Sequence, residues 1–289
     1  MTVHRLIGSP LAAIIFLVTA GTVSAQTQKE LLDELDRTIE EAESYVSAKE
    51  LRIKTIENTL HSRGVSPERQ YRIYGELFDE YQPFNYGKAV ETLDKQMEIA
   101  MLLGDKSKLN DVYLKEAMLN TAAGEFLEAR NDLARVDTTI FTKEQEIAYC
   151  NVQQRFWFDY DENQKGADKS MLRKVAYYRE RLLALANPSS SLSRYVTVRK
   201  YIDEKNFAQA DFINRHSLSR MDPASHDYAN LAYFQARICE SLNRREEMKN
   251  WFIRSAMADI KTATKDNASL FSLADALFKD GDYARAFKY

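Results

Sequence analysis

The chain has 289 residues, of which 29% are charged and 45% hydrophobic, and its formal net charge is −3. That charge supplies no basic face, so we expect no nucleic-acid contact by this region. Nine Gly and five Pro are too few for a β-sandwich, a barrel or a nucleotide-binding α/β sheet, which use these residues in their turns. Good helix formers are abundant and accompany 16 Tyr and 14 Phe, which favours an all-helical, aromatic-rich protein.

Residues 1–25 carry the three parts of a secretory signal peptide. Arg5 gives a positive start, residues 11–18 are apolar, and small residues lead to a cleavage site after Ala25. An uncleaved anchor is the less favoured alternative, because Gly, Ser and Pro interrupt the segment and a membrane span needs about 20 mostly apolar residues. We therefore expect an exported protein whose mature chain begins at Gln26.

Residues 26–63 are predicted to form one long helix. Apolar residues repeat there at spacings of three and four, which predicts a continuous helix of roughly 50 Å. Lys49 is the only polar residue in this seam, whose members are Leu32, Leu35, Ile39, Ala42, Val46, Lys49, Ile53, Ile56 and Leu60. The seam has two interpretations: a helix packed along the rest of the chain, or a coiled coil that forms a homodimer through residues 29–63 with Lys49 setting its register.

Residues 64–289 contain many helix start and stop signals. A short element, in which Gly or Asn precedes an aromatic residue that is followed by Ala, recurs with its aromatic position at 86, 126, 207 and 283 and a weaker copy at 245. The separations are 40, 81, 38 and 38 residues, and the interval of 81 holds a degenerate copy near Gly166. Such a period predicts a solenoid, in which the aromatic residue begins the second helix of a hairpin and Ala lets the two helices approach.

These hairpins resemble the tetratricopeptide repeat (TPR), although their period exceeds that family's usual one. The expected fold is therefore all-α: a right-handed α-solenoid of TPR-like hairpins over residues 64–289, preceded by the long N-terminal helix. Five hairpins in a row would share one continuous core.

The sequence carries no recognisable catalytic constellation. The histidines of the mature chain, His61, His216 and His226, do not have the spacing of a metal site. No phosphate-binding loop, nucleophile elbow or S-x-x-K motif occurs. We therefore expect no catalytic residue, no metal and no cofactor, and predict that the chain is not an enzyme. Cys150 and Cys239 lie in helical patterns of different repeats, so we expect no disulfide between them.

Aromatic stripes, such as the one in residues 71–81, are typical of a solenoid core, and the alternative is an aromatic-lined concave groove. Two adjacent aromatic residues cannot both face the core. One of Phe156 and Trp157, and one of Tyr177 and Tyr178, is therefore a better candidate for the groove. We select Trp157 and Tyr178 as the candidate groove aromatics.

Several blocks of the sequence together resemble one family. The most specific is Ser255-Ala-Met-Ala-Asp-Ile-Lys261, and the others are Gly281–Tyr289, the tyrosine stripe in residues 71–81, and Leu35-Asp36, Ile39, Tyr45, Lys49-Glu50 and Arg52-Ile53. Over about residues 28–289 the chain resembles the periplasmic region of membrane-anchored helix-turn-helix transcriptional regulators from gut Gram-negative anaerobes.

This resemblance implies a sensory region on the periplasmic side of the inner membrane that signals by binding rather than catalysis. Family members continue into a transmembrane helix, a cytoplasmic coiled coil and a DNA-binding domain, so we expect a membrane anchor beyond Tyr289 and a truncated last hairpin. The expected ligand is a peptide, a glycan or an envelope protein. The alternative function is a free-standing periplasmic TPR-like scaffold for envelope protein assembly.

Overall fold

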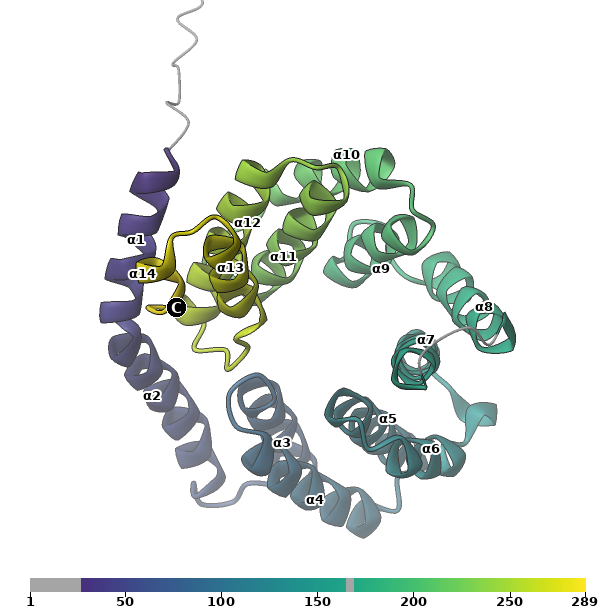
Figure 1. Ribbon diagram of the computed structural model, residues 1–289. Helices are drawn as coiled ribbons and strands as arrows, with labels where there is room; N and C mark the ends of the chain where they lie inside the picture. Colours follow the sequence, from purple (N-terminus) through teal and green to yellow (C-terminus); the bar gives the residue numbers. More distant parts are fainter. Residues whose placement is uncertain (1–26, 165–168) are drawn as a thin grey trace, which may run out of the picture.

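The computed structural model describes residues 27–164 and 169–289, where the chain forms fourteen α-helices, one short 3₁₀ helix and no strand (Figure 1). The predicted signal peptide and the repeat copy near Gly166 lie outside the described residues. None of the described helices combines the length and the apolar character needed to cross a membrane. The helices are α1 (Gln28–Glu40), α2 (Ala42–Leu60), α3 (Pro67–Tyr81), α4 (Tyr86–Leu103), α5 (Lys106–Ala123), α6 (Phe126–Arg135), α7 (Lys143–Asn163), α8 (Lys169–Leu185), α9 (Ser191–Asp203), α10 (Phe207–Leu218), α11 (His226–Ser241), α12 (Arg245–Lys261), α13 (Ala268–Lys279) and α14 (Tyr283–Ala286), with the 3₁₀ turn at Thr138–Ile140.

From α3 onward, consecutive helices pack in antiparallel pairs, which confirms the predicted all-α solenoid of hairpins. The pairs are α3–α4, α5–α6, α7–α8, α9–α10, α11–α12 and α13–α14. The second helix of a hairpin begins at each predicted position, 86, 126, 207, 245 and 283. The alanine three residues later is fully buried at Ala89, Ala129 and Ala210, so it lets the paired helices approach as expected.

The left-handed residue that follows a helix is not the same in every repeat. Gly104, Gly124 and Gly281 end helices in the left-handed conformation, with φ between 62° and 82°, which Gly adopts without steric cost. Lys205 and Asn243 adopt the same conformation with φ of 57°, although neither is Gly. The hairpin joint therefore keeps its geometry where its sequence signal has weakened.

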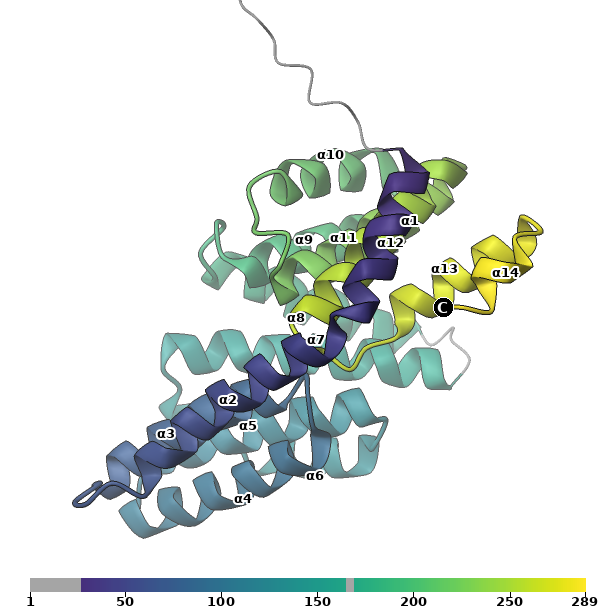
Figure 2. The same ribbon diagram turned by 90° about the vertical axis from the view of Figure 1, so that its left-hand side faces the viewer.

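The prediction of one continuous helix over residues 26–63 is wrong. The segment forms α1 and α2, which meet at an angle at Glu41 (Figure 2). The two halves of the seam pack against different parts of the chain: Leu31, Leu32 and Leu35 of α1 are buried with residues of α12 and α13, whereas Ile53 of α2 is buried with residues of α3 and α4. A straight helix could not reach both surfaces.

The seam thus packs within its own chain, as the first of its two interpretations expected. A dimerising coiled coil would have needed the same side chains. Lys49, which that alternative used to set register, is buried, and its Nζ lies 2.6 Å from Oε2 of Glu80 on α3. Lys49 therefore joins α2 to the first hairpin.

The solenoid curls until its last hairpins return to its first (Figure 1). The backbone N–H of Lys265, in the loop between α12 and α13, donates a hydrogen bond of 2.9 Å to the carbonyl of Pro83 after α3. Ala263 in the same loop is only 5% exposed and joins the core of the first hairpin. α1 packs along α12, so α1 and α2 run across the closure from one end of the array to the other (Figure 2).

Candidate functional site

From α3 to α12, the first helix of each hairpin lies on the inner side of the ring and the second on the outer side (Figure 1). α3, α5, α7, α9 and α11 therefore supply the inner wall. Two cavities are both lined by Asp79, on α3, and by Gln82, in the loop between α3 and α4.

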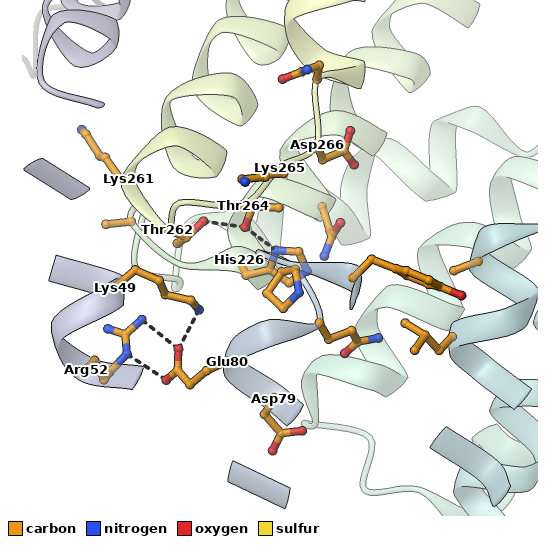
Figure 3. Close-up of a pocket in the computed structure, with 18 of the residues that line it drawn as sticks. Lys49, Arg52, Asp79, Glu80, His226, Lys261, Thr262, Thr264, Lys265 and Asp266 are labelled. Atoms are coloured by element: carbon orange, nitrogen blue, oxygen red, sulfur yellow. Dashed lines mark hydrogen bonds and ion pairs between the residues drawn. The ribbon is translucent and has the colours of Figure 1, made fainter. Parts of the chain in front are cut away.

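The larger space, here called the closure cavity, has a volume of about 830 Å³ and lies where the two ends of the array meet (Figure 3). Lys49 and Arg52 of α2 and Glu80 of α3 approach it from the N-terminal side. Its other wall comes from α11, α12 and the loop after α12, and includes His226, Asn230, Lys261, Thr262, Thr264, Lys265, Asp266 and Asn267. A molecule held across this cavity would contact residues more than 140 positions apart in the sequence.

Ion pairs fix the N-terminal wall. Arg52 donates to both carboxylate oxygens of Glu80, with Nε–Oε1 2.8 Å and Nη2–Oε2 3.0 Å, while Lys49 binds the same carboxylate. Burial would raise the pKa of Glu80, but the hydrogen bonds from Lys49 and Arg52 outweigh it and hold that pKa below its usual range. Glu80 is therefore an anchored anion that orients two cations.

The opposite wall is more weakly tied. Oγ1 of Thr264 lies 3.4 Å from Nδ1 of His226 and 2.9 Å from Oγ1 of Thr262, and Nζ of Lys265 lies 5.1 Å from the centre of the Phe84 ring. The hydroxyl, amide and charged groups on this wall offer hydrogen bonds of both kinds to a ligand.

The smaller space, here called the inner groove, has a volume of about 350 Å³ and lies between α3, α5 and α7. Its central cation is Lys115, whose Nζ lies 3.3 Å from Oε1 of Gln96 and 4.9 Å from the centre of the Phe78 ring. Burial lowers the pKa of Lys115, and the carboxylates of Asp79 and Asp111 oppose that shift. Burial raises the pKa of Asp79, against the influence of Lys115.

Gly75, inside α3, makes room for this arrangement. A Cβ at that position would lie 3.0 Å from Nε2 of Gln96 and 3.6 Å from Nζ of Lys115. A Gly in a helix interior is a sequence signal of such close approach, and this one could have led to the inner groove. The partnership of Lys49 with Glu80 had no comparable signal.

The candidate groove aromatics lie elsewhere, because neither Trp157 nor Tyr178 lines the closure cavity or the inner groove. Trp157 is half-buried; its Nε1 donates to Oε1 of Gln153 at 2.9 Å, and Nζ of Lys174 lies 3.4 Å from the centre of its ring. Its neighbour Phe156 is in the core. Trp157 is thus the more exposed member of its pair, as chosen.

For the second pair the choice was wrong. Tyr178 packs against the core cluster that contains Cys150, Leu182 and Val196, and burial raises its pKa to about 12. Tyr177 is the exposed member, at 61%. Helical periodicity separates adjacent residues onto different faces, but it does not say which face is the core.

In the stripe of residues 71–81, Tyr71, Phe78 and Tyr81 are all buried, and Tyr71 and Phe78 also line the inner groove. The cysteines are both buried and free, Cys150 on α7 and Cys239 on α11. Among the described residues, no group of His, Cys, Asp and Glu side chains is placed to hold a metal ion. Of the histidines named above, His226 borders the closure cavity.

Comparison with known proteins assigns the array to a family. No curated protein matches the chain. The family model described as the SusR N-terminal TPR domain matches residues 39–289, from the end of α1 onward. Domains of the TPR type are typically non-catalytic and generally mediate protein–protein interactions. The match spans most of the sequence, and the chain therefore belongs to the SusR N-terminal TPR domain family.

Proposed function

We propose that this chain is the exported sensory and protein-interaction region of a membrane-bound transcriptional regulator, on the periplasmic side of the inner membrane, and that it signals by binding. The observation that carries the proposal is the closure cavity, whose walls come from the two ends of a TPR-type array. The signal-peptide pattern of residues 1–25 and the resemblance of residues 28–289 to such regulators support the location and the context.

Binding in the closure cavity would act on the shape of the whole array. A ligand that contacts Arg52 on one wall and Lys265 on the other bridges α2, which precedes the first hairpin, and the loop between the last two hairpins. Each hairpin of a solenoid contacts only its neighbours, so a small rotation at each interface adds up over the array. The ligand would increase the population of the closed ring, and the size of this shift would depend on how much more tightly the ligand binds the closed ring than more open conformations.

The chemistry of the cavity favours a polar segment of a protein. Its walls present cations, carboxylates and neutral hydrogen-bonding groups at once, which suits a backbone with mixed side chains. The cavity volume of about 830 Å³ lies within the usual range for ligand sites, about 300–1,000 Å³. A loop or an extended peptide of an envelope protein is therefore the proposed ligand.

The context is tested by locating the natural protein. Antibodies raised against residues 27–289 should detect a membrane-bound polypeptide larger than the 33.4 kDa of this chain, and an alkaline phosphatase fused after residue 289 of the signal-bearing chain should be active outside the cytoplasm. A freely soluble periplasmic protein no larger than this chain would contradict the regulator and favour the scaffold alternative.

Ligand binding is tested by charge reversal in the closure cavity. The variant Lys265→Glu keeps the backbone bond from residue 265 to Pro83 but reverses a charge on one wall of the cavity. It should abolish the transcriptional response of the regulator while circular dichroism stays unchanged. The matched control is Lys95→Glu on α4, which is exposed and does not line the cavity. An equal loss of response in both proteins would contradict the assignment of the site.

A further inference from the structure

The inner groove contains opposite charges that do not pair with one another. Among the described residues that line it, Lys115 is the cation, and Asp79 and Asp111 are the carboxylates. Asp111 and Lys115 are four residues apart on α5, a spacing at which side chains of opposite charge ordinarily form an ion pair. In the described part of the chain, however, no carboxylate lies within ion-pair distance of Nζ of Lys115.

Buried glutamines from the neighbouring helices hold these charges apart. Gln145, on α7, is only 4% exposed, and its Nε2 donates to Oδ1 of Asp111 at 2.7 Å. Gln96, on α4, is only 2% exposed, and its Nε2 donates to the carbonyl of Tyr71 at 3.0 Å. This bond fixes the amide of Gln96 so that its Oε1 accepts from Lys115. The separation of the charges is therefore built into the packing of α4, α5 and α7.

Lys115 keeps unused hydrogen-bonding capacity in the groove. An ammonium group has three N–H donors, and the described chain offers Nζ of Lys115 one hydrogen-bond acceptor, Oε1 of Gln96 at 3.3 Å. Burial of a cation without a counterion is unfavourable, and burial accordingly lowers the pKa of Lys115. A ligand that brings a carboxylate to Nζ would supply the missing partner.

Asp79, on α3, offers a position for a cation in the same groove. Its carboxylate forms no hydrogen bond or ion pair with the residues that the structure describes. Asp79 and Lys115 each affect the pKa of the other, so the two groups are neighbours although they are not paired. An uncharged ligand would leave both groups without a partner, and a ligand of one sign would satisfy one group and be repelled by the other. A ligand that carries both signs satisfies both.

We propose that the inner groove binds a small zwitterion, an α-amino acid or a dipeptide, with its carboxylate on Lys115 and its ammonium group on Asp79. The side chain of the ligand would lie on the apolar part of the groove, which includes Leu114, Met118 and Val152. The volume of about 350 Å³ is near the lower end of the range for ligand sites, about 300–1,000 Å³, which suits a molecule of this size. Lys115 does not line the closure cavity, so this site is independent of the ligand proposed there.

Isothermal titration calorimetry of the purified mature chain tests the proposal. The probes are L-valine, L-leucine, L-methionine, L-phenylalanine and the dipeptide L-alanyl-L-leucine, of which at least one should bind. The N-acetyl form of that probe lacks the ammonium group and its amide lacks the carboxylate. Each should bind at least about tenfold more weakly, because each loses a charge-assisted hydrogen bond. Absence of binding by all five probes, or equal binding of the three forms of one probe, overturns the proposal.

Two variants test the placement of the ligand. Lys115→Met removes the charge but keeps most of the length of the side chain, and Asp79→Asn keeps the shape of the carboxylate. Each should weaken binding of the zwitterion at least about tenfold while circular dichroism stays unchanged. The matched control is Lys106→Met, at an exposed position of α5 that lines neither cavity, and it should bind like the wild type. An unchanged affinity in either groove variant overturns the placement.

Discussion

Tyr289 Oη donates a hydrogen bond of 2.6 Å to Oδ1 of Asp36, which joins two residues 253 positions apart. Nζ of Lys288 lies 2.7 Å from the other oxygen of the same carboxylate. Burial opposes ionisation of Asp36, but these partners outweigh it and lower its pKa. Asp36 precedes residue 39, where the match to the family begins. The contacts of Tyr289 and Lys288 with Asp36, here called the clasp, therefore join α1 to the C-terminal end of the family domain.

Loss of the clasp should destabilise the closed ring. Tyr289→Phe removes one hydrogen bond to a charged acceptor and keeps the ring in place, so we expect a loss of about 1 kcal/mol in the free energy of unfolding, measured by urea denaturation. Hydrogen exchange should accelerate chiefly in α1. Tyr283→Phe is the control, because its side chain is exposed; if the two variants behave alike, the clasp does not stabilise the ring.

Much of the fold could be predicted from the sequence, because its signals are local. The start of a helix depends on residues only a few positions apart, and for this reason the starts at Phe207 and Tyr283, which the side chains of Asn206 and Asp282 cap, were correct. The bend at Glu41 could not be predicted in this way. It depends on the packing of α1 with α12 and of α2 with α3, and periodicity does not identify partners that lie more than 200 residues away.

The candidate site was the harder part for the same reason. The closure cavity exists only because the ring returns to its start, so its two walls carry no shared sequence pattern. Lys49 stood out as the single polar residue of the seam, yet Glu80, its partner, resembles many other surface glutamates. Aromatic residues suggested a groove at Trp157 and Tyr178, whereas the aromatic rings that line the inner groove are those of Tyr71 and Phe78, and the closure cavity is lined by polar and apolar groups alike.

Adjacent tyrosines on α8 should differ sharply in their effect on stability. Tyr178→Ala removes a side chain that packs against Leu182 in the core and should cost about 3 kcal/mol. Tyr177→Ala removes a side chain that is 61% exposed and should change the free energy of unfolding by no more than about 0.5 kcal/mol. Thermal denaturation of the two variants makes the comparison, and equal effects would mean that the placement of this face of α8 is wrong.

The two cysteines should be unreactive until the protein unfolds. Burial raises the pKa of both Cys150 and Cys239 to about 11, and the thiolate is the reactive form. A thiol reagent at neutral pH should therefore modify neither residue quickly in the folded protein and both in denaturant without a reductant. A denatured, non-reduced chain with no titratable thiol would contradict the separation of α7 from α11.

The ion pairs of Glu80 with Lys49 and Arg52 should make the free energy of unfolding depend on pH in the acidic range. Lys49→Met leaves the half-buried carboxylate of Glu80 with Arg52 alone and should cost about 2 kcal/mol at neutral pH, less than complete removal of a buried partner. The exposed Lys54 on the same helix offers the control, Lys54→Met, which should cost about 0.5 kcal/mol or less.

The pH dependence of this effect has a definite sign. Because the pKa of Glu80 is lower in the folded protein, the unfolded chain binds the proton more tightly, and acid favours unfolding. The contribution of the triad should be complete above the ordinary glutamate pKa of about 4.3 and should decline as the pH falls through the lower folded value. Glu80→Gln should remove this part of the acid dependence.

We would measure urea unfolding of the wild type and Glu80→Gln from neutral pH downward. If the free energies of unfolding of the two proteins fall by the same amount as the pH is lowered, the result would contradict the role assigned to Glu80.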